Sequence, residues 1–213
     1  MMKVAIQNNA KVLALFAVAC TAVVSLVNLL TKDSIARQEQ QQLLATLHQV
    51  IAPERINNDL YQDCQFIKDV EFLGSNKSQT AYIARMDHMP VAVAITSVAP
   101  DGYNGNIQLL VAINVDGTLS GVRVLKHKET PGLGDKIETR KGEWVYNFDD
   151  KYIIDDKDSR WAVKKDGGMF DQFTGATITP RAVVKAVKNT MIYFNQHQKD
   201  IITNTTSCRG QHD

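Results

Sequence analysis

NIQLLVAINVDGTLSGVRVLKH, residues 106–127, is the stretch that decides the fold of this chain. Two runs rich in aliphatic and β-branched residues, 106–115 and 118–127, flank the pair Asp116-Gly117. Runs of this kind that are bounded by turn residues are typical of β-strands. Asp-Gly is a preferred pair for a type I′ hairpin turn, in which both central residues have positive φ. The stretch therefore predicts two antiparallel strands joined by a tight turn.

The sequence before this hairpin continues the same β pattern. The runs AYIARM (81–86) and VAVAITSV (91–98) are again short and mostly apolar. We therefore expect an antiparallel sheet between about residues 65 and 127. Two loops with little side chain, 101–105 and 130–134, lie beside the expected strands.

Two segments after the sheet region have the apolar spacing of helices. The first, 137–148, is predicted from the positions of Ile137, Trp144, Val145 and Phe148. The second, 180–194, is predicted from a buried stripe of Val183, Val184, Val187, Met191 and Phe194. Thr179 is the expected N-cap of the second helix, and Pro180 suits the first helical position, where its missing N–H costs nothing.

Residues 12–30, VLALFAVACTAVVSLVNLL, form an uncharged apolar run near the start of the chain. As a helix, about 19 residues span roughly 28 Å, close to the thickness of a bilayer core. The alternative is a cleaved signal peptide, whose apolar region is normally about 7 to 15 residues long. The greater length favours an uncleaved anchor. The predicted fold class is thus α+β: an antiparallel β-sheet domain with packed helices, preceded by one N-terminal transmembrane helix.

Five segments follow from this organisation. They are a cytoplasmic tail (1–11), a transmembrane anchor (12–30), a stalk helix with linker (31–60), a folded domain (61–195) and a mobile tail (196–213). The stalk is predicted from one apolar helical face, formed by Ile35, Leu43, Leu44, Leu47 and Ile51. Lys and Arg are equally numerous on the two sides of the span, so the short basic amino-terminal tail decides the orientation. We expect it in the cytoplasm and the domain outside.

Charge and cysteine content restrict the classes of function. The chain has 213 residues, 24 basic and 23 acidic, so no basic field is available for a nucleic acid. Cys20 lies in the apolar run, which leaves Cys64 and Cys208 as a pair in an oxidising compartment; a disulfide and two separate thiols both stay open. No metal site is predicted, and the acidic segment 149–158 fits a solvated turn better than a calcium loop.

The segment DQFTGATITP, residues 171–180, combines a turn of small residues with a helix start. Thr177 stands near the free N–H groups and the positive end of the helix dipole, where a phosphate is favoured. Gly175 and Ala176 leave its hydroxyl reachable from outside. Local chemistry alone also allows Thr174, Thr177 and Thr179 to be ordinary turn residues.

DQFTGAT resembles the flavinylation motif D-x-x-[ST]-G-A-[ST] of FMN-binding domains. In that family a separate flavin transferase moves FMN from FAD onto the last hydroxyl. The resemblance implies that Thr177 is an FMN phosphoryl threonine and that FMN is the covalent cofactor. The other motif positions are Asp171, Thr174, Gly175 and Ala176.

The resemblance extends over almost the whole chain. Residues 101–106, 107–136 and WAVKKDGG (161–168) are similar to the G subunit of the Rnf electron-transport complex. The C subunit of the sodium-pumping NADH:quinone reductase represents a related family, usually of longer chains. The resemblance implies a flavoprotein subunit in the bacterial inner membrane, with a periplasmic domain and other redox subunits as partners. It also places the loop residues Thr130, Gly132, Leu133 and Gly134 beside the flavin, and Lys136 is a further candidate for contact. A tight turn at the two glycines and a solvated surface charge at Lys136 stay open as alternatives.

The expected function is that of an electron relay. No GxGxxG follows a predicted strand and no Walker loop occurs, so the chain is not a complete dehydrogenase. The cofactor performs the redox chemistry, and no catalytic side chain is predicted. Tyr103, Trp144 and Trp161 are candidates for stacking on the flavin ring, although core packing explains both tryptophans equally well. The alternatives are a membrane-tethered scaffold without cofactor and a free-standing periplasmic reductase.

Overall fold

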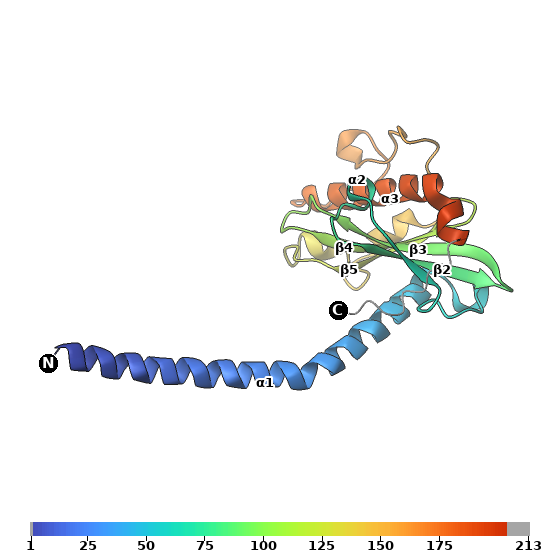
Figure 1. Cartoon of the computed structure of the whole chain (residues 1–213). Helices are drawn as coiled ribbons and strands as arrows, with labels where there is room; N and C mark the ends of the chain where they lie inside the picture. Colours follow the sequence, from blue (N-terminus) through green and yellow to red (C-terminus); the bar gives the residue numbers. More distant parts are fainter. Residues whose placement is uncertain (1, 204–213) are drawn as a thin grey trace. The chain divides into compact units, whose positions relative to one another are not determined.

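The computed structural model describes residues 2–203, except for the side chains of residues 2–5 and 8. It divides into two compact units, the first ending at Leu43 and the second beginning at Leu44. The elements (Figure 1) are α1 (Met2–Val50), η1 (Pro53–Arg55), β1 (Cys64–Ile67), α2 (Val70–Leu73), β2 (Gln79–Met86), β3 (Met89–Ala99), β4 (Ile107–Asn114), β5 (Leu119–Lys126), η2 (Gly134–Ile137), η3 (Trp144–Phe148), η4 (Lys164–Asp166) and α3 (Ile178–Thr203).

The second unit is built on a five-stranded sheet in the order β1-β2-β3-β4-β5, in which all neighbours are antiparallel. The predicted antiparallel sheet is therefore confirmed. Its register places Val93 opposite Ile113 and Val111 opposite Val122, so side chains of one face meet in rows across the sheet. This face carries most of the domain's hydrophobic core.

The β4–β5 turn differs from the prediction, and a turn of the expected type lies between β2 and β3 instead. The β4–β5 hairpin is present, but only Gly117 of the expected pair has positive φ, 87°. The Asn114 N–H donates to the Thr118 carbonyl at 2.8 Å, which leaves a three-residue loop ending in a left-handed glycine rather than a type I′ turn. A two-residue turn with positive φ at both positions joins β2 to β3, at Asp87 and His88 (51° and 65°).

Helix α3 covers the core face of the sheet and contacts β3 and β4 (Figure 1). The predicted apolar stripe is confirmed, because Val183, Val184, Val187, Met191 and Phe194 are all buried. The helix continues nine residues past its predicted end at 194, so residues 196–203 of the expected tail are helical. Ile201, 1% exposed, anchors the extension. Residues 204–213 lie outside the described part of the chain.

The helix predicted over 137–148 is absent. Two short 3₁₀ turns, η2 and η3, stand there instead, separated by a turn in which Glu138 O accepts from Lys141 N and Gly142 N at 3.0 and 3.2 Å. This turn interrupts the helical hydrogen-bond ladder. The side chains of Ile137, Trp144, Val145 and Phe148 are nevertheless buried, as their spacing suggested.

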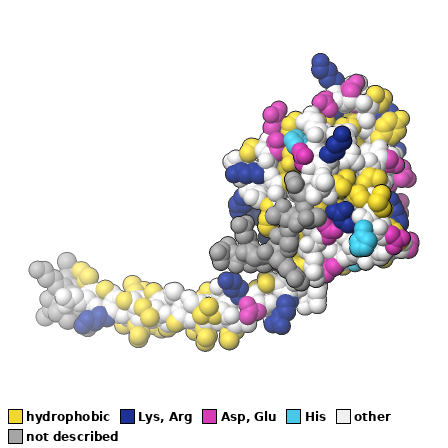
Figure 2. Space-filling model, turned by 45° about the vertical axis from the view of Figure 1, so that its right-hand side comes forward, with side chains coloured by type: hydrophobic (Ala, Val, Ile, Leu, Met, Phe, Trp, Pro, Cys, Tyr) yellow, Lys and Arg dark blue, Asp and Glu magenta, His cyan; other side chains and the backbone are white. Residues whose placement is uncertain are grey.

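Helix α1 runs without interruption through the expected anchor and the expected stalk. From Asn9 it is long and apolar enough to cross a membrane, with a most apolar window of mean hydropathy 2.4 and no part of that window buried. Figure 2 shows its hydrophobic side chains along the visible face of the helix. One N-terminal membrane-spanning helix, as predicted, is therefore supported.

The last residues of α1 belong to the second unit and are packed into it. Leu47 and Val50 are 0% and 3% exposed. Two side chains of β5 hold the helix end: Ser120 Oγ donates to the Val50 carbonyl at 2.5 Å, and Arg123 Nη2 donates to the Gln49 carbonyl at 3.2 Å. A guanidinium at a helix C-terminus also complements the negative end of the helix dipole.

Candidate functional site

A pocket of about 250 Å³ lies between the start of α3 and two loops of the domain. It is lined by Tyr103, Glu129, Thr130, Leu133, Gly134, Gly175, Ala176, Thr177, Ile178 and Thr179. The structure thus brings together the DQFTGAT segment and the TPGLG loop, which are far apart in the sequence. The loop 101–105 completes the pocket through Tyr103.

The TPGLG loop folds as a tight turn. The Thr130 carbonyl accepts from the N–H groups of Leu133 and Gly134, both at 3.1 Å. Pro131 and Gly132 occupy the central positions, and Gly132 has φ 77°, as the third residue of a type II turn requires. The turn leaves the Leu133 side chain 42% exposed at the edge of the pocket.

The DQFTGAT segment forms a second turn immediately before α3. The Ala176 N–H donates to the Phe173 carbonyl at 3.1 Å, and Gly175 has φ 80°. Phe173 is buried against Trp144, with ring centroids 5.2 Å apart, so the beginning of the turn is fixed to the core. Thr174, at the tip, is exposed and does not line the pocket.

Helix α3 begins two residues earlier than predicted, which corrects the expected cap. Its first residue is Ile178, and the Thr177 carbonyl accepts from the Arg181 N–H at 3.3 Å. Thr177 therefore occupies the N-cap position. Thr179 lies inside the first turn, 1% exposed, and its hydroxyl donates to Glu129 Oε2. The N–H groups of Ile178 and Thr179 have no intrahelical acceptor by helix geometry, so they face the start of the helix.

Glu129 is a pocket residue that the sequence did not reveal. Its carboxylate is 4% exposed and accepts from the Asn104 N–H at 3.0 Å as well as from Thr179. Its own N–H donates to His127 Nδ1 at 3.0 Å, so the ring proton resides on Nε2, which donates to Glu138 at 2.7 Å. This hydrogen bond lowers the pKa of the Glu138 carboxyl.

Further contacts fix the loop 101–105 against its neighbours. Asn104 Nδ2 donates to Thr130 Oγ1 at 3.3 Å, and the Lys185 ammonium of α3 lies 2.6 Å from Asp101 Oδ2. Gly102 is required here, since a Cβ at this position would lie 2.2 Å from the Gly105 carbonyl oxygen. The loop therefore holds Tyr103, 64% exposed, at the pocket mouth.

Several predicted site residues lie away from the pocket. Asp171 is exposed and pairs with Lys164 at 2.7 Å, while its carbonyl accepts from the Trp144 indole at 2.7 Å. Gly132 and Lys136 are exposed and do not line the pocket.

Both tryptophans are core residues, at 8% and 5% exposure, so stacking on an external ring is excluded for them. They pack among Phe148, Phe170 and Phe173. Among the three candidates, Tyr103 alone remains available to stack on a ligand.

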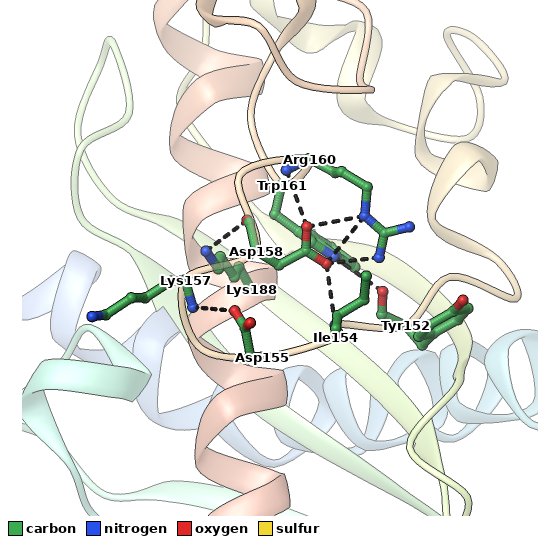
Figure 3. A network of polar contacts seen from close by, with 8 residues as sticks. All are labelled: Tyr152, Ile154, Asp155, Lys157, Asp158, Arg160, Trp161 and Lys188. Atoms are coloured by element: carbon green, nitrogen blue, oxygen red, sulfur yellow. Dashed lines mark hydrogen bonds and ion pairs between the residues drawn. The ribbon is translucent and has the colours of Figure 1, made fainter.

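The acidic segment is a polar turn. Asp158, 7% exposed, accepts from the Ile154 and Arg160 N–H groups and forms a forked pair with the Arg160 guanidinium, and Lys188 donates to its carbonyl (Figure 3). The Arg160 guanidinium, together with the Ile154 and Arg160 N–H groups, holds the pKa of the Asp158 carboxyl far below its usual value. Within residues 2–203, no cluster of three or more metal-ligating side chains occurs. Figure 2 shows basic and acidic side chains mixed over the visible face of the domain, in agreement with the near-zero net charge.

Fold and site together define a class of protein. It has one membrane-spanning helix and a domain with an open pocket beside a threonine at the start of a helix. Residues 102–191, which contain the whole pocket, match the FMN-binding domain family, and residues 1–50 match the RnfG N-terminal region. The chain is 51% identical to the G subunit of the ion-translocating oxidoreductase complex of Shewanella loihica, with both chains covered completely.

Other relatives with the same name give the same result. The Shewanella baltica protein is 52% identical over 97% of each chain, and the Vibrio cholerae protein is 50% identical over 99% of this chain and all of the relative. The chain belongs to the family of G subunits of ion-translocating oxidoreductase complexes. The predictions of an Rnf G subunit and of an FMN-binding domain are thereby confirmed.

Proposed function

We propose that this chain carries FMN as a phosphoester on Thr177 and works as an electron relay among the other subunits of its membrane complex. Membership of the family supports the electron-transport role and the cofactor class. The attachment site is inferred from the different environments of the three threonines around the turn.

The environments of these threonines leave one candidate. Thr174 is exposed at the tip of the turn and lies outside the pocket. Thr179 is buried, and its hydroxyl is engaged by Glu129. Thr177 lines the pocket, is partly exposed and stands at the start of α3, where N–H groups and the helix dipole favour a phosphate. Of the three, only Thr177 combines access, a pocket and a favourable electrostatic position.

The pocket fits a tethered flavin better than a dissociable one. At about 250 Å³ it is smaller than the roughly 300–1,000 Å³ of sites that enclose a whole ligand. Tyr103, Leu133 and Ile178 form an exposed apolar rim, at 64%, 42% and 45% exposure, against which a flat ring can pack. A covalent bond retains the cofactor when the contact area alone is small, because it keeps the local concentration high.

The attachment is a group transfer to the Thr177 hydroxyl. Its oxygen takes the FMN phosphoryl group of FAD from a flavin transferase, the P–O–P bond of FAD breaks, AMP leaves and the hydroxyl proton is released. Bound FMN supplies one- and two-electron transfer. The residues of the chain would then hold it: the α3 N–H groups would bind the phosphate, and the apolar rim would pack against the ring and exclude water.

The test is in-gel flavin fluorescence of the full chain made together with a flavin transferase. Wild type should give a fluorescent band after denaturing electrophoresis, and Thr177→Val should give none. Thr174→Val is the matched control, because it removes the same hydroxyl outside the pocket and should keep at least part of the signal. A dark wild-type band would favour the scaffold without cofactor, and a bright Thr177→Val band would move the attachment to another threonine.

We also propose that the domain lies on the periplasmic side of the inner membrane. The short basic amino-terminal segment before the span favours retention of the N-terminus in the cytoplasm. A reporter enzyme that is active only outside the cytoplasm should be active when fused after Asp213. A stable but inactive fusion would reverse this placement.

A further inference from the structure

Glu129 is a buried acid that lines the pocket and has no cationic partner among the described residues. Its side chain is 4% exposed, whereas glutamates are almost never fully buried unless paired. None of the ion pairs found within residues 2–203 includes it. The nearest charged neighbours in its network, Glu138 and Arg140, are reached only through the neutral ring of His127.

Each carboxyl oxygen of Glu129 has one hydrogen-bond partner in the structure. Oε1 accepts from the Asn104 N–H at 3.0 Å and Oε2 accepts from the Thr179 hydroxyl. Both partners can donate, so together they can stabilise a carboxylate, which accepts at both oxygens. The positive end of the α3 dipole, one residue from Thr179, further stabilises a negative charge here.

The surrounding packing keeps this charge at the pocket wall. A Cβ on Gly134 would lie 2.8 Å from Thr179 Oγ1 and 3.0 Å from Glu129 Oε2, so only a glycine leaves room for both side chains here. Tyr103, Leu133 and Ile178 surround the same pocket with apolar surface. Because Glu129 is only 4% exposed, water screens its charge less, and the charge acts on the pocket contents more strongly than it would in water.

We propose that the Glu129 carboxylate lowers the reduction potential of the flavin held in this pocket. This proposal rests on the proposed function, because it requires FMN at Thr177. A fixed negative charge opposes the addition of electrons to a neighbouring group, so it favours the oxidised flavin. Its hydrogen bonds serve a second purpose, since they join the loop 101–105, the TPGLG loop and the first turn of α3.

The experiment separates the charge from the hydrogen bond. Full-length protein is made with the flavin transferase in detergent, and the flavin spectrum is followed during a reductive titration with mediators. Glu129→Gln removes the charge and keeps the size of the side chain. Thr179→Val removes the hydrogen bond to Oε2 and keeps the charge. Thr190→Val is the matched control, since Thr190 is buried in the same helix and bonds only the Ala186 carbonyl, at 2.8 Å.

The expected result is an upward shift of the midpoint potential in Glu129→Gln, a clearly smaller shift in Thr179→Val and no shift in Thr190→Val. Glu129→Ala is a second charge-free variant for the case that the glutamine variant does not accumulate, and it should shift the potential in the same direction. An unchanged or lowered potential in a folded, flavin-bearing Glu129 variant would overturn the proposal. Equal shifts in Glu129→Gln and Thr179→Val would also overturn it, since packing rather than charge would then be responsible. Absence of flavin from the wild type would contradict the proposed function instead.

Discussion

Gly134 occupies the point where the TPGLG loop meets the first turn of α3. An added Cβ would lie 2.8 Å from Thr179 Oγ1 and 3.0 Å from two atoms of Glu129. Overpacking of this kind typically costs about 1–3 kcal/mol. We predict that Gly134→Ala lowers both the thermal stability of the chain and the fraction that carries flavin.

Gly142→Ala is the matched control for this prediction. Its Cβ would have the Lys136 carbonyl oxygen as nearest neighbour, at 3.6 Å, and its φ is not in the left-handed region. Stability should be unchanged or slightly raised, because alanine restricts the unfolded chain. Thermal unfolding followed by tryptophan fluorescence measures both variants, since the two tryptophans of the chain are buried in the domain. Equal stability of the two variants would contradict the contact at Gly134.

Single residues show how far a sequence predicts a site. The position of Thr177 in the candidate pocket could be predicted because the motif is a local feature. Glu129 could not, since its partners Asn104 and Thr179 are 25 and 50 residues away and no local pattern marks a buried glutamate. Asp171 illustrates the reverse case: the motif includes it, but in the fold its carboxylate turns to Lys164 rather than to the pocket.

At the scale of elements, the last turn of α1 is part of the folded domain. Leu47 is 0% exposed, and Ser120 and Arg123 of β5 hold the helix end by hydrogen bonds. Truncation of a buried leucine to alanine costs about 2–5 kcal/mol. We predict that Leu47→Ala destabilises the domain by this amount, measured as tryptophan-monitored unfolding in detergent.

The same substitution earlier in the helix provides the control. Leu30 is 73% exposed in α1, so Leu30→Ala should leave the domain's unfolding temperature unchanged. If Leu47→Ala behaved like Leu30→Ala, the helix end would not contribute to the domain core.

The polar turn from Tyr152 to Trp161 should make the stability of the domain depend on pH. Hydrogen bonds from Arg160 hold the pKa of Asp158 far below its unfolded value of 3.8. A depressed pKa means that the carboxylate stabilises the fold above the unfolded pKa, and that this stabilisation is lost as the pH falls below it. Asp158→Asn should therefore lower the unfolding temperature at pH 7, and its difference from wild type should shrink below about pH 4.

Asp156→Asn is the control for the polar turn, because Asp156 is exposed and accepts only a 3.3 Å bond from Gln196. Its effect should be small at every pH. A wild-type advantage over Asp158→Asn that stayed constant from pH 7 to pH 3 would show that the charge of Asp158 is not responsible.

The elements also show which parts of a fold a pattern can predict. The strands follow alternation and turn residues, and their positions were predicted to within two residues for β2, β3, β4 and β5. The last nine residues of α3 could not be predicted, because the polar run 195–200 hides a helix that Ile201 and the partly buried Ile202 anchor to the core. The apolar spacing in 137–148 correctly predicted which side chains are buried but wrongly predicted a helix. Buried 3₁₀ turns can give the same spacing.

At the scale of the whole molecule, one membrane-spanning helix and a domain with a small open pocket suit a covalently held cofactor. The proposed placement of the domain outside the cytoplasm also predicts whether the cysteines are oxidised. If the domain lies outside the cytoplasm, Cys64 and Cys208 are in an oxidising compartment, where thiols of exported proteins form disulfides. Cys20 lies in the apolar part of α1 and is exposed there.

We therefore predict a Cys64–Cys208 disulfide that forms in the cell. Cys64 begins β1 and is 3% exposed, while Cys208 lies outside the described residues. The measurement is alkylation with a mass-tagged maleimide after acid quenching and denaturation, so that burial of Cys64 does not protect it. One cysteine, Cys20, should react before reduction and all three after it, and Cys64→Ser should make Cys208 reactive without reduction. Three reactive thiols in unreduced wild type would contradict the disulfide, and together with an inactive fusion after Asp213 they would place the domain in the cytoplasm.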